Sequence, residues 1–281
     1  MSIRLIALDI DGTLLDSEWQ VPEANLDAVA RAVARGIEVV RATGRRFDFA
    51  RPIAEQLPAP VTLIVSNGAL VKSGDGSTRL AHLLSADVAR RILEATVDFR
   101  ESAAVVFDRQ RERQLIFERI DWQTPSRRTA FAEKQRAYIA EVDPLEECLI
   151  EDPVQVSFNG TFADMVALQD AIASLPFRGS FSLAVTEYES RDFTLDDVMA
   201  PGCSKGATLE RWAGSRGIAR AEVMAVGDNL NDIEMLEYAG LPVVMGNAVP
   251  ALRRDGWHVT GTNDEAGVAE AIERFVLREP S

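Results

Sequence analysis

Two aspartates follow the first apolar run of the chain. Asp9 and Asp11 stand two residues apart, directly after residues 3–8. A short apolar run of this kind predicts a buried strand, and an open α/β sheet binds its ligands beyond the carboxyl ends of the strands. Neighbouring carboxylates repel each other unless a cation or a shared proton relieves the repulsion. The pair therefore predicts a metal-assisted site with one carboxylate as nucleophile and the other as acid/base group.

Three further polar segments stand where predicted strands end or predicted helices begin, at residues 43–45, 204–206 and 227–232. The carboxyl ends of parallel strands share one edge of the sheet, so we expect these segments to meet Asp9 and Asp11 in one crevice. Each segment alone also fits an ordinary turn or helix cap. All of them in this order favour a single site.

The acidic residues of these segments suit a hard metal ion. Asp9, Asp11 and Asp228 offer oxygen ligands of the kind that Mg²⁺ prefers. The chain has a formal net charge of −14, so an anionic substrate needs a local positive source. The sequence therefore predicts Mg²⁺ as the cofactor.

The remaining polar groups suit a phosphate. Thr43 and the backbone N–H groups near Gly12 and Gly44 can donate hydrogen bonds to phosphate oxygens. Gly12 also lets the backbone turn sharply and approach a ligand. Lys205 supplies a compact positive charge at the start of a predicted helix.

The elements that must position these residues follow an α/β rhythm at both ends of the chain. Apolar patterning predicts strands over 3–8, 37–42, 61–65, 222–226 and 241–245, and helices over 22–36, 46–57, 204–216 and 265–277. This order, with short connections, predicts a parallel sheet with helices on both faces.

The middle of the chain has a different pattern. A hairpin turn is expected at 74–77, followed by helices over 86–99, 126–140 and 162–175 and strands over 103–107, 114–118, 154–158, 181–186 and 193–197. We therefore expect an α/β protein: a doubly wound, mostly parallel, Rossmann-like core at 1–84 and 196–281, and an inserted α+β domain with an antiparallel sheet at 85–195.

Composition excludes several classes of function. Apolar residues make up 47% and charged residues 26% of the 281 residues, as in an ordinary globular enzyme. The negative net charge argues against a nucleic-acid or membrane partner. Acidic residues interrupt the N-terminal apolar run and exclude a signal peptide, which predicts a cytoplasmic protein. We also expect a monomer or a small homo-oligomer. Cys148 and Cys203 have no C-x-x-C spacing and are expected to be buried thiols.

The motifs together resemble those of a known family. DIDGTLL at 9–15, ATGR at 42–45, SNGA at 66–69, SKG at 204–206, GDNLNDIEML at 227–236 and VMGNA at 244–248 are similar to the haloacid dehalogenase-like superfamily of phosphatases, specifically its Cof-type group. The resemblance covers both α/β segments. In the insert it extends only to position and approximate order of elements.

The resemblance implies roles for the core residues. Asp9 would take the phosphoryl group as an aspartyl-phosphate, and Asp11 would protonate the leaving oxygen and later activate water. Thr43 and Lys205 would hold the phosphate. Asp228 would complete the Mg²⁺ site alongside the Asp9 carboxylate and the Asp11 carbonyl.

Further residues are expected to support the site. Asn231 and Asp232 would support the phosphate, Lys205 and the metal shell, and Arg45 and Asn67 lie in matching motifs. The family's insert acts as a cap that sets substrate choice. Candidate cap contacts, each of which also fits a solvated surface or ordinary packing, are Arg119, Trp122, Arg127, Arg128, Tyr188 and Arg191.

The leading hypothesis is a Mg²⁺-dependent phosphomonoester hydrolase for a small phosphorylated metabolite, with sugar phosphates first and flavin or pyridoxal phosphates compatible. A phosphomutase or phosphotransferase would use the same residues. A phospho-signalling receiver would place its phosphorylated aspartate after the third strand, where this chain has Ser66 and Asn67. A silent metabolite sensor would not need the nucleophile.

Overall fold

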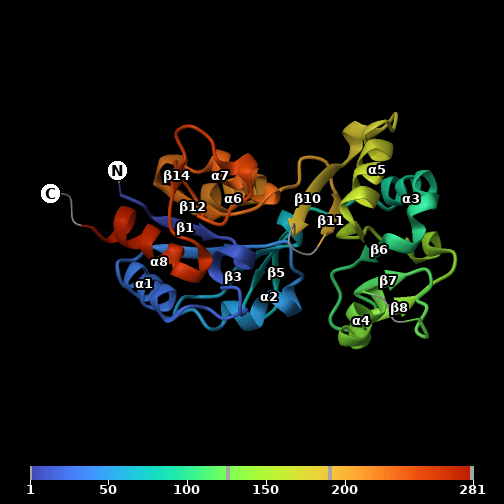
Figure 1. Cartoon of the computed structure of the whole chain (residues 1–281), viewed down its shortest axis with the longest axis horizontal. Helices are drawn as coiled ribbons and strands as arrows, with labels where there is room; N and C mark the ends of the chain where they lie inside the picture. Colours follow the sequence, from blue (N-terminus) through green and yellow to red (C-terminus); the bar gives the residue numbers. More distant parts are fainter. Residues whose placement is uncertain (1, 125–126, 189–191, 279–281) are drawn as a thin grey trace. The chain divides into compact units, whose positions relative to one another are not determined.

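The chain folds as two compact units, coloured along the sequence in Figure 1. Residues 1–81 and 204–281 form the first unit, and residues 82–203 form the second. The computed structural model describes the backbone of all residues except 1, 125–126, 189–191 and 279–281, and it leaves out the side chains of residues 127–128 as well.

The division differs by a few residues from the expected boundaries at 84/85 and 195/196. Strand β11 (Phe193–Met199) pairs antiparallel with β10 (Ser182–Tyr188) as far as Met199, which lies opposite Ser182. Because this pairing holds the whole of β11 in the second sheet, the chain returns to the first unit only after residue 203.

The first unit is built on a mostly parallel sheet with the order β14-β13-β12-β1-β2-β3-β4-β5. Neighbours from β14 to β3 are parallel, and β3, β4 and β5 are joined by antiparallel pairs. The strand bounds are β1 Leu5–Leu8, β2 Glu38–Ala42, β3 Thr62–Val65, β4 Leu70–Ser73, β5 Thr78–Ala81, β12 Val223–Gly227, β13 Leu241–Val244 and β14 His258–Val259.

Helices cover both faces of this sheet, as Figure 1 shows. Successive residues of a strand point to opposite faces. Leu5 and Ala7 of β1 pack in one apolar cluster with side chains of α6 and α7, whereas Ile6 and Leu8 pack in another with α1 and α8. The doubly wound core is thus confirmed. Its helices are α1 Glu23–Ala34, α2 Phe47–Ala54, α6 Lys205–Ser215, α7 Ile233–Tyr238 and α8 Gly267–Ile272.

The second unit has its own sheet, with the order β10-β11-β9-β6-β7-β8. Helices α3 and α5 contribute to an apolar cluster with one face of the sheet. The elements not yet given are α3 Ala86–Ala95, α4 Arg127–Lys134, α5 Phe162–Ala173, β6 Ala103–Val106, β7 Leu115–Phe117, β8 Ile139–Glu141 and β9 Gln155–Gly160.

Two expectations for this second unit were wrong. The helix expected over 126–140 ends at Lys134, and Ile139–Glu141 forms β8 instead. Strand β8 pairs parallel with β7, so the sheet is not wholly antiparallel. In this pairing Ile139, which is partly buried, lies opposite Leu115 of β7.

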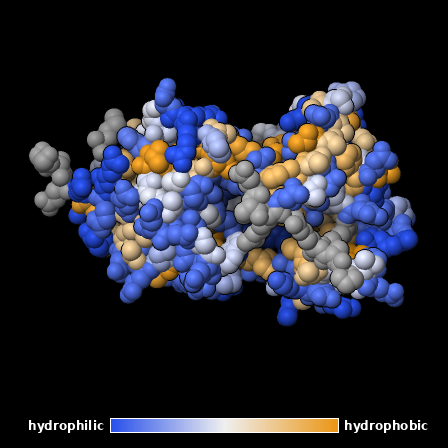
Figure 2. All heavy atoms as spheres, viewed as in Figure 1, coloured by the Kyte–Doolittle hydropathy of each residue, from blue (hydrophilic) through white to orange (hydrophobic). Residues whose placement is uncertain are grey.

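Hydrophilic side chains cover much of the face drawn in Figure 2, with hydrophobic ones in smaller patches. Among the described helices, none has the length and apolar character needed to cross a bilayer. Cys148 and Cys203 are both buried, and neither forms a disulfide.

Candidate active site

The first part of the site is the turn that follows β1. The backbone N–H of Asp9 donates to the carbonyl of Val226 in β12, 3.0 Å away, and this bond holds Asp9 at the end of the parallel pair. A short turn over Ile10–Leu14 follows, bent at Gly12, whose φ is +77°. A Cβ on Gly12 would lie 2.3 Å from Oδ2 of Asp228. Gly12 therefore permits the close approach of the two acidic segments.

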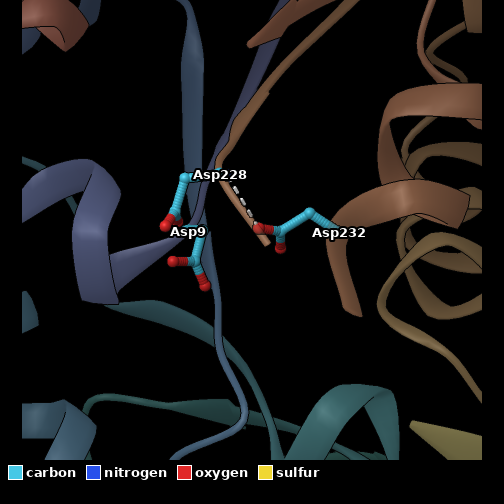
Figure 3. A group of neighbouring side chains, drawn as sticks. All are labelled: Asp9, Asp228 and Asp232. Carbon is cyan, nitrogen blue, oxygen red and sulfur yellow. Dashed lines mark hydrogen bonds between the residues drawn. The ribbon is translucent and has the colours of Figure 1, made fainter. Parts of the chain in front are cut away.

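The second part is a group of three buried carboxylates, drawn in Figure 3. One carboxylate oxygen from each of Asp9, Asp228 and Asp232 lies within 4.8 Å of the others. Asp228 follows β12, and Asp232 ends a short 3₁₀ turn four residues later. Thr13 donates from Oγ1 to Oδ1 of Asp228 at 3.0 Å. The structure thus brings the N-terminal turn and the 227–232 segment together.

Asp232 has both oxygens engaged. Its Oδ2 accepts hydrogen bonds from the backbone N–H groups of Asp228 and Asn229 at 3.0 and 3.1 Å, and the first is the dashed line in Figure 3. Its Oδ1 accepts from Lys205 at 2.7 Å. Asp232 therefore orients its neighbours, which leaves Asp9 and Asp228 as the better placed metal ligands.

Lys205 faces the acidic group from the first turn of α6. Ser204 caps this helix and accepts from the backbone N–H of Ala207 at 3.1 Å. The Lys205 Nζ lies 2.6 Å from Oδ1 of Asp9, and the side chain is 1% exposed. Burial acts to lower the pKa of Lys205, but the carboxylates of Asp232 and Asp9 outweigh burial and raise it. Lys205 is therefore held as a buried cation.

The charge balance of this group tests whether a metal ion fits. Burial, opposed by Lys205 and assisted by Asp232 and Asp11, raises the pKa of Asp9 to about 8. Burial, followed by the charges of Asp9 and Asp232, raises the pKa of Asp228 well above its usual value. One lysine does not neutralise three buried carboxylates, so the donor set has the excess negative charge and hard oxygens that suit Mg²⁺.

Asp11 lies apart from these three carboxylates in its contacts. Arg45 donates two hydrogen bonds to its carboxylate, from Nε to Oδ2 at 2.7 Å and from Nη2 to Oδ1 at 2.5 Å. A bidentate contact of this kind fixes the plane of a carboxylate. Arg45 thus positions the Asp11 side chain.

The residues expected to hold phosphate form a connected network. Thr43, fully buried after β2, accepts from the backbone N–H of Arg45 at its Oγ1, 3.1 Å away. Its carbonyl accepts from the backbone N–H of Asn67 at 3.1 Å, and Asn67 Oδ1 accepts from Asn231 Nδ2 at 2.8 Å. A Cβ on Gly44 would lie 3.1 Å from Asn67 Oδ1. The structure therefore places these predicted residues around one another.

Three contributing residues were missed by the sequence reasoning. Thr13 lies inside the first motif, yet nothing in the spacing indicated its bond to Asp228. Asn247 donates to the Gly12 carbonyl at 2.8 Å, and its Oδ1 accepts from the backbone N–H of Asn263 at 2.9 Å. The VMGNA segment was the available signal for Asn247, while Asn263 carried none.

The candidate cap contacts lie in the second unit, and their described partners are also there. Arg119 pairs with Asp143 at 2.6 Å and is 79% exposed. Trp122 donates from Nε1 to Glu141 at 2.8 Å. The ring of Tyr188 lies 6.1 Å from that of Phe193. Arg191 and the side chains of Arg127 and Arg128 lie outside the described residues.

Known proteins resemble the chain over nearly its full length. The family model for haloacid dehalogenase-like hydrolases matches residues 6–272. Phosphatase YwpJ of Bacillus subtilis is 31% identical, covering 98% of this chain and 100% of the relative. An HMP-PP phosphatase of Serratia proteamaculans is 30% identical, covering 99% and 96%. The curated 5-amino-6-(5-phospho-D-ribitylamino)uracil phosphatase YcsE of Bacillus subtilis is 29% identical, covering 99% and 97%.

Solved structures agree with this result. A haloalkanoate dehalogenase-superfamily phosphatase from Bacteroides thetaiotaomicron superposes with a TM-score of 0.79 at 27% identity, covering 98% of this chain and 95% of that one. A haloacid dehalogenase-like hydrolase from B. subtilis gives the same TM-score and identity, covering 98% and 100%. The chain therefore belongs to the haloacid dehalogenase-like hydrolase family and is an enzyme of its phosphatase group.

Proposed function

We propose that the chain is a Mg²⁺-dependent phosphomonoester hydrolase that transfers the phosphoryl group of a small metabolite to Asp9 and then to water. The observation that carries this proposal is the buried contact of Asp9 with Lys205, beside the Asp228 carboxylate. A carboxylate in this position can attack phosphorus while fixed positive charge balances the phosphate.

In the first step, a carboxylate oxygen of Asp9 forms a bond to phosphorus as the ester P–O bond breaks. The leaving oxygen takes a proton from Asp11, whose orientation Arg45 fixes through its two hydrogen bonds. Lys205 lies against Asp9 and reduces the repulsion between the carboxylate and the phosphate. The products of this step are the free alcohol and an aspartyl-phosphate.

In the second step, water attacks the phosphorus of the aspartyl-phosphate and the P–O bond to Asp9 breaks. Asp11, now ionised, accepts the proton of the attacking water. Asp9 and Asp228, with the Asp11 carbonyl, would hold the Mg²⁺, which supplies positive charge that favours ionised carboxylates and neutralises the phosphate. Because burial raises the pKa of Asp9 to about 8, Asp9 needs such positive charge nearby to be ionised at neutral pH.

The names of the relatives indicate a broad class of substrate. One relative is named for a phosphorylated ribitylaminouracil and another for HMP-PP. We propose a small phosphorylated metabolite for this chain, and sugar phosphates remain the first prediction from the sequence.

The test is phosphate release from p-nitrophenyl phosphate and a panel of metabolite phosphates, with and without Mg²⁺. Asp9→Asn should lose at least about a thousandfold in rate, because the nucleophile is removed. Asp255→Asn, an exposed aspartate of the same unit, is the matched control and should retain full activity. Wild-type rates in a folded Asp9→Asn protein would rule out the proposal, and product analysis with added sugar would identify transfer in place of hydrolysis.

A further inference from the structure

An exposed indole follows the nucleophile turn. Trp19 is 46% exposed, although tryptophan is among the side chains that gain most from burial. Its φ is +62°, a left-handed conformation that is uncommon and strained for a residue with a large side chain. Backbone strain of this kind persists only where the surroundings enforce it, and it gathers at ligand sites.

The loop around Trp19 is held from two directions. Asp16 Oδ1 accepts from the backbone N–H groups of Glu18 and Gln20 at 2.9 and 2.8 Å. The Ser17 backbone N–H and Oγ both donate to the carboxylate of Asp264, at 2.7 and 2.8 Å. These bonds fix the strained backbone, and they also occupy the short polar groups of the loop.

A single side chain, that of Arg45, contacts both the Trp19 ring and Asp11, the proposed acid/base residue. The Arg45 Cζ lies 5.6 Å from the centroid of the Trp19 ring, within the range of cation–π attraction. The same guanidinium holds both oxygens of Asp11. A leaving group that receives its proton from Asp11 therefore departs beside the Arg45–Trp19 pair.

We propose that Trp19 is a specificity-determining residue that stacks on the leaving group, and that the enzyme favours phosphate esters whose leaving group carries a planar aromatic or heteroaromatic ring. This inference rests on the proposed function. A partly exposed indole next to a guanidinium offers a flat, polarisable surface. Asp16 and Ser17 are engaged with the loop backbone and with Asp264, so the indole is the large flat surface that this loop offers to a leaving group.

Two substrates that differ mainly in whether the leaving group carries a flat ring test the proposal. Benzyl phosphate and cyclohexylmethyl phosphate have primary-alcohol leaving groups of similar size, and only benzyl phosphate carries a flat ring. In Trp19→Ala we expect KM for benzyl phosphate to rise about fivefold to tenfold, the effect of losing one aromatic stacking contact. We expect kcat to stay within about twofold, because the contact is present before and during the reaction. KM for cyclohexylmethyl phosphate and for ribose 5-phosphate should change by less than about twofold.

Three further variants separate stacking from folding. Trp19→Phe keeps a ring and should retain most of the preference for benzyl phosphate. Trp19→Gly relieves the left-handed backbone, so its Tm should equal or exceed that of the wild type while KM for benzyl phosphate rises as in Trp19→Ala. Val259→Ala, at an exposed position 44% accessible on β14, is the control and should change neither constant.

The result that would overturn the inference is an equal loss for all three substrates in Trp19→Ala, or no loss for any. A fall in kcat with an altered pH profile would also overturn it, since Trp19 would then act only through Arg45 on Asp11. Titration calorimetry of benzyl phosphate into Asp9→Asn, with and without Trp19→Ala, separates the two proposals. Weaker binding in the double variant supports stacking even where the wild type shows no turnover, whereas unchanged binding contradicts it.

Discussion

At the scale of single residues, the site depends on how closely two chain segments approach. Gly12 has no side chain at the point where Asp228 lies nearest. This allows the turn after β1 and the turn after β12 to bring their carboxylates close together. The geometry makes a glycine substitution at this position a direct probe of the site.

Gly12→Ala should lower the free energy of unfolding by about 2–4 kcal/mol, the sum of left-handed strain and a steric clash, and should also impair activity. Gly36→Ala is the matched control. Gly36 has a φ of +79° but nothing within 4 Å of an added Cβ, so it should show the strain alone, about 1 kcal/mol, with full activity. Urea unfolding and phosphate release measure both effects. Equal losses in the two variants would contradict the importance of the close approach.

At the scale of elements, β11 places neighbouring aspartates on opposite faces of the second sheet. Asp196 is fully buried, and its two oxygens contact the same Gln169 amide nitrogen of α5, both at 3.1 Å. Burial, opposed by Gln169 and assisted by Asp197 and Glu187, raises the pKa of Asp196 to about 7. The neighbouring Asp197 instead accepts hydrogen bonds from Gln155 and Ser157 at 2.7 and 2.5 Å.

Replacing these two aspartates by asparagine should change the free energy of unfolding in opposite directions. A carboxyl whose folded pKa is raised contributes full stability below its unfolded pKa and loses it as pH rises through the folded value. The loss for Asp196 thus falls between about pH 4 and pH 7. Asp196→Asn, which cannot ionise, should therefore be more stable than the wild type at pH 8 by about 1–3 kcal/mol, and this advantage should vanish near pH 3.

Asp197→Asn serves as the contrast because it removes a carboxylate acceptor from Gln155 and Ser157. It should be less stable than the wild type at pH 8 by about 1–2 kcal/mol. Urea unfolding at a series of pH values measures both variants. A pH-independent effect of Asp196→Asn would contradict the prediction, because it would show that the pKa of this carboxyl does not change on folding.

The sequence predicted the elements around the site better than the contacts between them. The continuous apolar runs of β1 and β12 predicted these buried strands, so Asp9 and Asp228 were expected at the strand ends where the structure has them. Lys205 was likewise expected at the start of the helix that is now α6. Strands β8 and β14, of three and two residues, were too short to leave a pattern. The grip of Arg45 on Asp11 and the link from Asn247 to Gly12 join distant segments, and such contacts depend on side-chain directions that no local spacing encodes.

At the scale of the molecule, each unit has a core of its own. The second unit buries an apolar cluster beneath α3 and α5 without using residues of the first. We expect residues 82–203 expressed alone to fold with a cooperative urea transition. Far-UV circular dichroism and dispersed amide NMR signals measure this, and a non-cooperative, undispersed fragment would show that the unit needs the rest of the chain.

Metal binding should be visible in the stability of the whole chain. A ligand that binds only the folded state raises the free energy of unfolding by RT ln(1 + [L]/Kd), or about 2.7 kcal/mol at a hundredfold excess over Kd. Mg²⁺ should therefore raise the Tm at pH 7.5, and EDTA should reverse the increase. In Asp228→Asn the increase should shrink strongly, whereas Asp255→Asn should keep it. An unchanged Tm in the wild type at 10 mM Mg²⁺ would oppose the proposed cofactor.

The position of the inserted unit has a consequence for biosynthesis. Strand β1 lies between β2 and β12, and β12 begins only at Val223. A ribosome releases Asp9, the proposed nucleophile, early, and it makes Lys205, Asp228 and Asp232 only after the whole insertion. Until then β1 can pair with β2 but lacks its other neighbour, β12, and the emerging chain lacks Lys205 and Asp228. Catalytic competence arrives late, once roughly the last quarter of the polypeptide has joined the sheet.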